Sequence, residues 1–175
     1  MSNIIVVYRS KTGFVKNYAE WIAKAVGADL REAKGVEITD LMKYDTIVYG
    51  GGLYAGGING FRLIKKNLDQ LKGKRLIVFT SGASPVRPEV VDEVKKHNLN
   101  PEEQKQVQFF MMRGGFNYNK LSPIDKFLMS LRKIQLKSIK NPDADARGML
   151  AAYSQPVDFT REKNIEPVVK AILAK

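Results

Sequence analysis

The sequence predicts an α/β fold, a doubly wound sandwich in which helices cover both faces of a five-stranded parallel sheet. Two observations predict it: short apolar segments rich in β-branched residues recur along the chain, and each is followed by a glycine- or serine-rich loop and then a helical pattern. This β-then-α alternation implies parallel strands joined by right-handed crossovers. A chain of 175 residues can bury a substantial core without disulfides or bound metal ions, so we expect one domain over residues 1–175.

The first strand is predicted at Ile4–Tyr8, and a helix over residues 17–26 follows a short polar loop. A strand that runs through such a loop into a helix offers unpaired backbone N–H groups and the positive end of the helix dipole to an anion. Ser10 and Thr12 add hydroxyl donors, while Gly13 lets the backbone approach a ligand closely. The loop therefore predicts a phosphate site, with an ordinary polar turn as the alternative. Its spacing matches neither the Walker loop nor the dinucleotide fingerprint.

The later elements follow the same alternation. Further strands are predicted at residues 28–33, 46–49, 75–80 and 107–112, and helices at 61–68 and 88–96. The glycine-rich stretch 50–60 is expected to lack regular structure. After the fifth strand the pattern breaks, and an insertion at about 114–157 precedes a terminal helix at about 161–173. This insertion holds a basic amphipathic helix over 122–137 and an irregular segment around 141–143.

The carboxyl ends of parallel strands meet at one edge of a doubly wound sheet, and ligands bind there. Loops rich in Gly, Ser and Thr, with an occasional aromatic residue, follow four of the predicted strands at residues 10–15, 51–57, 81–84 and 114–118. Their backbone amides can reach a phosphate and the polar edge of a ring, and the aromatic side chains can cover its face. Together these loops predict a site for a planar ring that bears a phosphate.

On these residues the chain resembles the flavodoxin-like FMN proteins over essentially its whole length. Ser10, Thr12 and Gly13 match the phosphate loop of that family, and Val15 stands where a third hydroxyl residue is expected. The resemblance implies a flavodoxin-like sandwich with the strand order 2-1-3-4-5 and a noncovalently bound FMN. The run 114–126 resembles the menaquinone-dependent protoporphyrinogen dehydrogenase branch of these proteins.

The resemblance also implies two sets of cofactor-binding residues. The phosphate would be bound by Ser10, Lys11, Thr12, Gly13, Phe14 and Val15, the last through its backbone only. The ring would be contacted by Tyr54, Ala55, Gly56, Ser81, Gly82 and Ala83, with Gly115 and Phe116 nearby. The loops lack the aromatic residues that stack on the flavin of many electron carriers. Tyr54 is the natural substitute and Phe116 or Tyr118 are further candidates, unless Tyr54 only anchors its loop.

The functional expectation is an FMN-dependent oxidoreductase that is quinone-linked or oxidises a porphyrinogen. Flavin chemistry needs no protein nucleophile, and one histidine without cysteine supports neither a transition-metal site nor a catalytic triad. A soluble flavodoxin-type electron carrier is the first alternative. A flavin-free interaction or nucleic-acid-binding domain is the second, although the aromatic residues are not interleaved with basic ones as nucleic-acid binding requires.

Charge points to anionic partners, because 29 Lys and Arg residues against 18 Asp and Glu give a net charge of +11. From residue 106 to 140, seven basic residues face the single acid Asp125. We therefore expect peripheral contact of helix 122–137 with an anionic membrane that holds a quinone, with packing of its apolar stripe on the sheet edge as the alternative. Since the chain has no cysteine and no apolar run of spanning length, a cytoplasmic location is expected.

Overall fold

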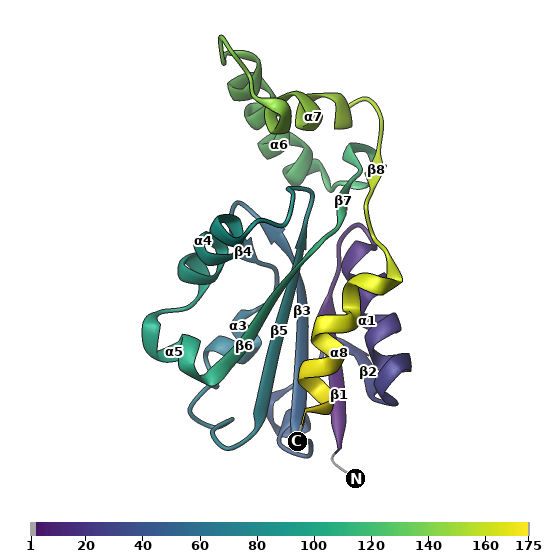
Figure 1. Ribbon diagram of the computed structural model, residues 1–175, viewed down its shortest axis with the longest axis vertical. Helices are drawn as coiled ribbons and strands as arrows, with labels where there is room; N and C mark the ends of the chain where they lie inside the picture. The colour runs from purple at the N-terminus through teal and green to yellow at the C-terminus, as the bar shows by residue number, and fades with distance from the viewer. Residues whose placement is uncertain (1–2, 175) are drawn as a thin grey trace.

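The computed structural model describes residues 3–174, which form a parallel sheet with helices on both faces and a helical extension at one end (Figure 1). The main sheet has the strand order β2-β1-β3-β5-β6, and all four pairings along this path are parallel. Its strands are β1 at Ile4–Arg9, β2 at Asp29–Glu32, β3 at Thr46–Tyr54, β5 at Arg75–Gly82 and β6 at Val107–Arg113. The predicted order of five parallel strands, 2-1-3-4-5, is confirmed.

The central strands carry continuous apolar runs, such as Ile47–Tyr49 of β3 and Leu76–Phe79 of β5, because both of their faces are buried. Alternate residues of β1 point to opposite sides, so that Ile5 and Val7 join one core and Val6 joins the other. The register places Ile5 opposite Ile47 of β3, which lies opposite Leu76 of β5. Each face of the sheet therefore carries its own hydrophobic core, and the two cores fix the strands in place.

Helices α1 at Phe14–Val26 and α8 at Glu166–Leu173 cover one face, and a 3₁₀ turn, η2 at Glu162–Ile165, leads into α8. The other face is covered by the segments around four helices, α2 at Ile38–Leu41, α3 at Arg62–Lys65, α4 at Pro88–Asn98 and α5 at Pro101–Gln106. Figure 1 shows α1 and α8 on the side of the sheet opposite to α3, α4 and α5. No helix within residues 3–174 has the length and apolar character needed to cross a membrane.

The glycine-rich stretch 50–60 is more regular than the sequence predicts. Strand β3 continues to Tyr54 and turns back as the antiparallel strand β4 at Gly57–Ile58. The reason is close packing: a Cβ atom on Gly50 would overlap the Phe79 ring, and one on Gly51 would lie 2.6 Å from the backbone oxygen of Asn59. These glycines permit a crowded strand, whereas the prediction took them as a sign of flexibility.

Three predicted helices also have different bounds, and the terminal one begins as α8 at Glu166 rather than at about residue 161, after the 3₁₀ turn η2. Helix α1 begins at Phe14, three residues before the predicted start, because Gly13 takes the cap position in the left-handed region at φ 99°. The helix predicted at 61–68 is a single turn, α3, which continues as hydrogen-bonded turns as far as Leu71. The earlier start of α1 matters most, since it places the first helical turn inside the predicted phosphate loop.

The insertion after β6 contains β7 at Gly115–Phe116, η1 at Tyr118–Lys120, α6 at Pro123–Lys137, α7 at Ala144–Ala152 and β8 at Val157–Asp158. Strands β7 and β8 pair antiparallel and bring the two ends of the insertion together. Helices α6 and α7 share a small core that includes Leu136, Ala146 and Tyr153. The sequence did not predict α7, which Asp143 caps by accepting the backbone N–H of Ala146 at 2.7 Å. The two helices project beyond the carboxyl edge of the sheet (Figure 1).

Candidate functional site

The loops that follow β1, β3, β5 and β6 meet at the carboxyl edge of the sheet. A Cβ atom built on Gly52 of β3 would lie 3.7 Å from the Val15 side chain and 3.6 Å from the Tyr54 side chain. The end of β3 is therefore in contact with the residues that follow the first loop. Gly114 stands against Ser81 and Phe14, and thereby joins the loops after β6 and β5 to the start of α1. The polarity of the parallel strands predicted this convergence.

The phosphate loop is ordered by its own hydroxyl group. The backbone N–H of Gly13 donates to Ser10 Oγ at 3.0 Å, and Ser10, Thr12 and Gly13 are all half-buried. No described side chain caps α1, so the backbone N–H groups of its first turn remain for water or a ligand. Val15 is 3% exposed and belongs to the core, which limits it to a backbone contact, as expected. The loop can surround a small anion with N–H and O–H donors.

Lys11 is held over this loop by a residue far along the chain. Its Nζ atom lies 2.8 Å and 3.0 Å from the two carboxylate oxygens of Asp125, in the first turn of α6. Asp125 is 6% exposed and also accepts a hydrogen bond from Ser122 Oγ at 2.8 Å. The hydrogen bond from Lys11 lowers the pKa of Asp125, with burial opposing this effect and Ser122 assisting it. The carboxylate is therefore charged at neutral pH, and it ties the insertion to the phosphate loop.

Tyr54 lies directly beside Lys11, whose Nζ atom is 4.0 Å from the centre of the Tyr54 ring. Burial, and then the negative charge of Asp125, raise the pKa of Tyr54 to about 12. The side chain is thus a neutral phenol at physiological pH. One face of its ring already contacts an ammonium group, so a planar ligand could stack only on the other face.

Ala55 and Gly56 form the tip of the β3–β4 hairpin, and both have positive φ angles, 49° and 82°. Asn98 of α4 holds this tip: its Oδ1 accepts the N–H of Ile58 at 2.9 Å, and its Nδ2 donates to the carbonyl oxygen of Gly56 at 2.8 Å. The exposed His97 ring lies beside Gly56. Sequence reasoning missed Asn98, because a buried Asn at the end of a surface helix carries no local signal of its distant partners.

Ser81 is a polar group without an internal partner. Its Oγ atom is buried at the end of β5, and within residues 3–174 nothing forms a hydrogen bond with it. A buried hydroxyl group left in this state costs about 1–3 kcal/mol, and a ligand that supplied a partner would remove that cost. Gly82 and Ala83 follow directly, and the carbonyl oxygen of Ala83 accepts a hydrogen bond from Arg113 Nε at 3.3 Å. This edge of the loop cluster therefore retains a free hydrogen-bonding group.

The structure assigns different places to the aromatic candidates. Phe116 is 8% exposed and packs edge-to-face on Tyr153 at 5.1 Å, while Tyr118 packs on the same ring at 5.5 Å. Phe116 lies in the core of the insertion and the half-buried Tyr118 packs against that core, so these contacts favour neither ring for stacking on a ligand, which stays an untested prediction. The Phe14 ring fills the space over Gly115, which leaves the backbone of Phe14 as its binding group. Tyr54 is the aromatic candidate that its position beside Lys11 favours.

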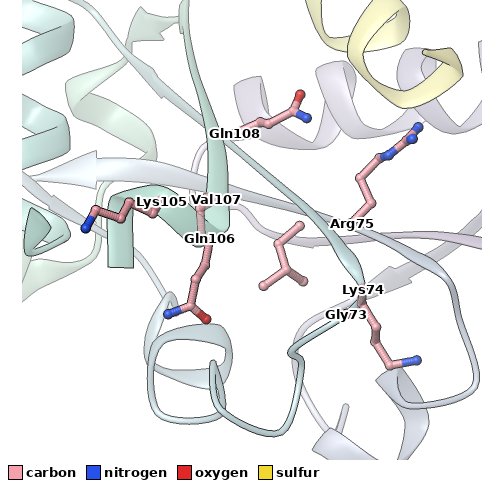
Figure 2. Close-up of a pocket in the computed structure, with 8 residues that line it drawn as sticks. Gly73, Lys74, Arg75, Lys105, Gln106, Val107 and Gln108 are labelled. Atoms are coloured by element: carbon pink, nitrogen blue, oxygen red, sulfur yellow. The ribbon is translucent and has the colours of Figure 1, made fainter. Parts of the chain in front are cut away.

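A separate hollow of about 400 Å³ lies at the opposite edge of the sheet, between residues 73–76 and 105–108 (Figure 2). Its cations are already engaged, since Lys74 donates to the carbonyl oxygens of Met42 and Tyr44, and Arg75 to that of Ile172. It also sits at the amino ends of the strands, away from the four loops. We therefore place the candidate site at the carboxyl edge, on the chemistry of the loops.

The model of the flavodoxin domain family matches residues 5–143, a range that includes all of α6. No curated protein matches the chain with significance. Similar solved structures include a WrbA-like flavodoxin from Agrobacterium tumefaciens, with 20% identity over 85% of this chain and 98% of that chain and a TM-score of 0.44. A flavoprotein in complex with FMN from Lactobacillus acidophilus has 19% identity, covers 65% of this chain and 93% of that chain, and has a TM-score of 0.41. The reduced flavodoxin of Megasphaera elsdenii has 18% identity, coverage of 71% and 94%, and a TM-score of 0.44.

Proposed function

The chain belongs to the flavodoxin domain family, and from this premise we propose that it is an FMN-dependent oxidoreductase that is quinone-linked or oxidises a porphyrinogen. The observation that carries the proposal is the convergence of four loops on the uncapped start of α1, with the unpartnered hydroxyl group of Ser81 beside it. The family match supports FMN as the cofactor. The loops supply the groups that a phosphate and a flavin ring require.

The phosphate of FMN fits the first loop. The hydroxyl groups of Ser10 and Thr12, the ammonium group of Lys11 and the backbone N–H groups at the start of α1 would bind it with charge-assisted hydrogen bonds. Gly13 is open on its outer side, with no atom within 4 Å of a built Cβ, so the backbone there is accessible. This donor set favours a terminal phosphate over an uncharged hydroxyl group.

The isoalloxazine ring fits the remaining loops. Ser81 would donate its hydroxyl hydrogen to a polar atom at the ring edge, and Tyr54 would cover part of the ring face. The hairpin tip at Ala55 and Gly56 would contribute backbone groups, held in place by Asn98. When bound, FMN supplies the electron transfer itself, while the protein binds and orients the ring and limits the access of water.

The insertion supports an enzyme that acts on a larger redox partner, either a porphyrinogen as electron donor or a quinone as electron acceptor, as in the menaquinone-dependent protoporphyrinogen dehydrogenase branch. Asp125 at the start of α6 contacts Lys11, so the insertion stands next to the proposed cofactor loop. A porphyrinogen or a quinone that approached the flavin would meet this element. A simple electron carrier offers no comparable reason for an insertion at this position.

The test begins with the visible spectrum of the purified protein, in which flavin bands should appear or be restored by added FMN. Anaerobic incubation with protoporphyrinogen and a soluble quinone should then produce protoporphyrin in proportion to the FMN bound. The test variant is Gly13→Ala, which should bind less FMN than the wild type and lose turnover in proportion to the FMN lost. Bound FMN without turnover would replace the enzyme proposal by an electron carrier, and no flavin binding at all would overturn the proposal.

A further inference from the structure

Helix α6 presents a continuous apolar stripe to solvent. Ile124, Phe127 and Ile134 are 74%, 63% and 65% exposed, and Leu128 and Leu131 lie between them on the same face. The spacing of these five residues, i, i+3, i+4, i+7 and i+10, places them in one row along the helix. The alternative that the stripe packs on the sheet edge is therefore wrong. The buried side of α6 carries Asp125 and Leu136 instead.

The stripe is presented by a helix that is firmly held from behind. Tyr153 Oη donates to the carbonyl oxygen of Met129 at 2.6 Å, and the hydroxyl groups of Tyr118 and Ser130 lie 2.8 Å apart. Ser122 caps the helix by accepting the N–H of Asp125 at 3.2 Å. The outward face of α6 is thus a defined feature of the fold, and its exposed apolar area needs an explanation.

Exposed basic residues accompany the stripe. Arg132, Lys137 and Lys140 lie on or just after α6 and are exposed, whereas Lys126 and Lys133 are half-buried and Lys133 Nζ lies 5.1 Å from the centre of the Tyr153 ring. The single acid of the helix, Asp125, is buried and neutralised by Lys11. The surface that α6 offers is therefore apolar along its centre and positively charged at its sides.

We propose that α6 docks this protein on an anionic lipid bilayer, with the apolar stripe at the boundary between headgroups and acyl chains. Helices that combine an apolar face with basic flanks bind membranes in this way, through buried apolar area and attraction to anionic headgroups. The helix lies on a part of the molecule that projects beyond the sheet (Figure 1). A projecting ridge of this kind can enter a headgroup layer without displacing the rest of the protein.

A bilayer fits this surface better than a second copy of the chain does. Two copies of α6 packed stripe to stripe would bring their basic residues close to one another, and like charges at that distance repel. An anionic bilayer has the complementary charge and needs no groove in a partner. Docking does not depend on the proposed function. Delivery of electrons to a quinone in that bilayer does, because it requires FMN in the loops next to α6.

The experiment is vesicle flotation of the full chain, with vesicles of phosphatidylcholine alone or mixed with phosphatidylglycerol, at low and high salt. We expect binding to the mixed vesicles that falls as salt rises, and much weaker binding to neutral ones. An R132Q/K137Q/K140Q variant should bind about 100-fold more weakly, since each basic residue near such a surface contributes about fivefold. An F127S/L131S/I134S variant should also lose binding.

The matched controls carry the same changes elsewhere on the surface. L30S/M42S alters two other exposed apolar side chains, and K24Q/K66Q/K163Q removes three exposed charges outside the insertion. Both should bind vesicles nearly as well as the wild type, apart from a small uniform effect of net charge. Equal binding by the stripe variant and the wild type, or no binding by either, would overturn the proposal.

Two further readouts separate the possible failures. Flotation is repeated with and without FMN, and because docking needs no flavin, a protein that binds vesicles but no FMN would remove only the proposed function. Sedimentation velocity is measured for the wild type and the stripe variant without lipid. A wild-type dimer that becomes a monomer in F127S/L131S/I134S would show that the ridge joins two copies, and would overturn membrane docking.

Discussion

The pair of Lys11 and Asp125 yields the sharpest prediction. The substitution Asp125→Asn keeps the shape of the side chain and its hydrogen bond with Ser122, but removes the charge that holds the Lys11 ammonium group at 2.8 Å. Since the Lys11 side chain is 40% exposed, water screens the pair. We therefore expect a loss of only about 1 kcal/mol in the free energy of unfolding at pH 7, and a smaller penalty than a fully buried pair would give.

The effect on cofactor binding should have the opposite sign. The carboxylate of Asp125 competes with the FMN phosphate for Lys11 and also repels the phosphate. Removal of the carboxylate charge should therefore strengthen FMN binding. A gain of about 1 kcal/mol, or about fivefold in affinity, is expected for one screened charge at this distance. Riboflavin, which has no phosphate, should bind the variant and the wild type equally. Fluorescence titration of the apoprotein with each flavin measures both quantities.

The control for this variant is Asp69→Asn, which breaks an exposed pair with Lys72 of the same 2.8 Å length. It should change the free energy of unfolding much less than Asp125→Asn does and leave FMN binding unaltered. Because the pKa of Asp125 is lowered in the folded protein, its stabilising effect is complete above its ordinary pKa of about 4. That effect is lost as the pH falls through the lower folded value. Unchanged or weaker FMN binding by Asp125→Asn, or an equal gain for riboflavin, would refute the reasoning.

Three other predictions concern the same loops. Gly13→Ala should lower the free energy of unfolding by about 1–2 kcal/mol in urea titrations, because φ 99° is strained for a residue with a side chain. Tyr54 favours its neutral form, so its stabilising effect is complete below about pH 10 and is lost as the pH rises through about 12. Burial also raises the pKa of Tyr49 and Tyr153, so ultraviolet titration should show several late phenols, and Tyr54→Phe should remove one of them. Asn98→Ala should cost about 1–3 kcal/mol, because the N–H of Ile58 loses its partner, and hydrogen exchange at residues 56–58 should accelerate.

Local patterns predicted the strands and the loop cluster because each signal lies within a few residues. The apolar run Ile4–Tyr8 and its polar loop need no distant partner to be recognised. The bounds of β3 were missed because Gly50 and Gly51 owe their place in the strand to Phe79 and Asn59, which sequence pattern does not connect to them. Packing overrode the local preference of glycine for loops.

The organisation of the site around Lys11 was missed for the same reason. Asp125 lies 114 residues from Lys11, and nothing near either residue indicates that they meet. The amphipathic pattern of α6 showed two faces but not which one turns inward. The structure places the small residues Ala146 and Ala152 of α7 in one core with Leu136, so the larger stripe faces outward.

The central claim is that the loop at residues 10–15 binds a phosphate, and titration of the apoprotein with FMN and with riboflavin tests it most directly. Each charge-assisted hydrogen bond to the phosphate contributes about 1.5–3 kcal/mol, so FMN should bind about tenfold more tightly than riboflavin, or more. The difference should shrink in Gly13→Ala, where the loop is strained. Equal affinities of the wild type for the two flavins would contradict the account.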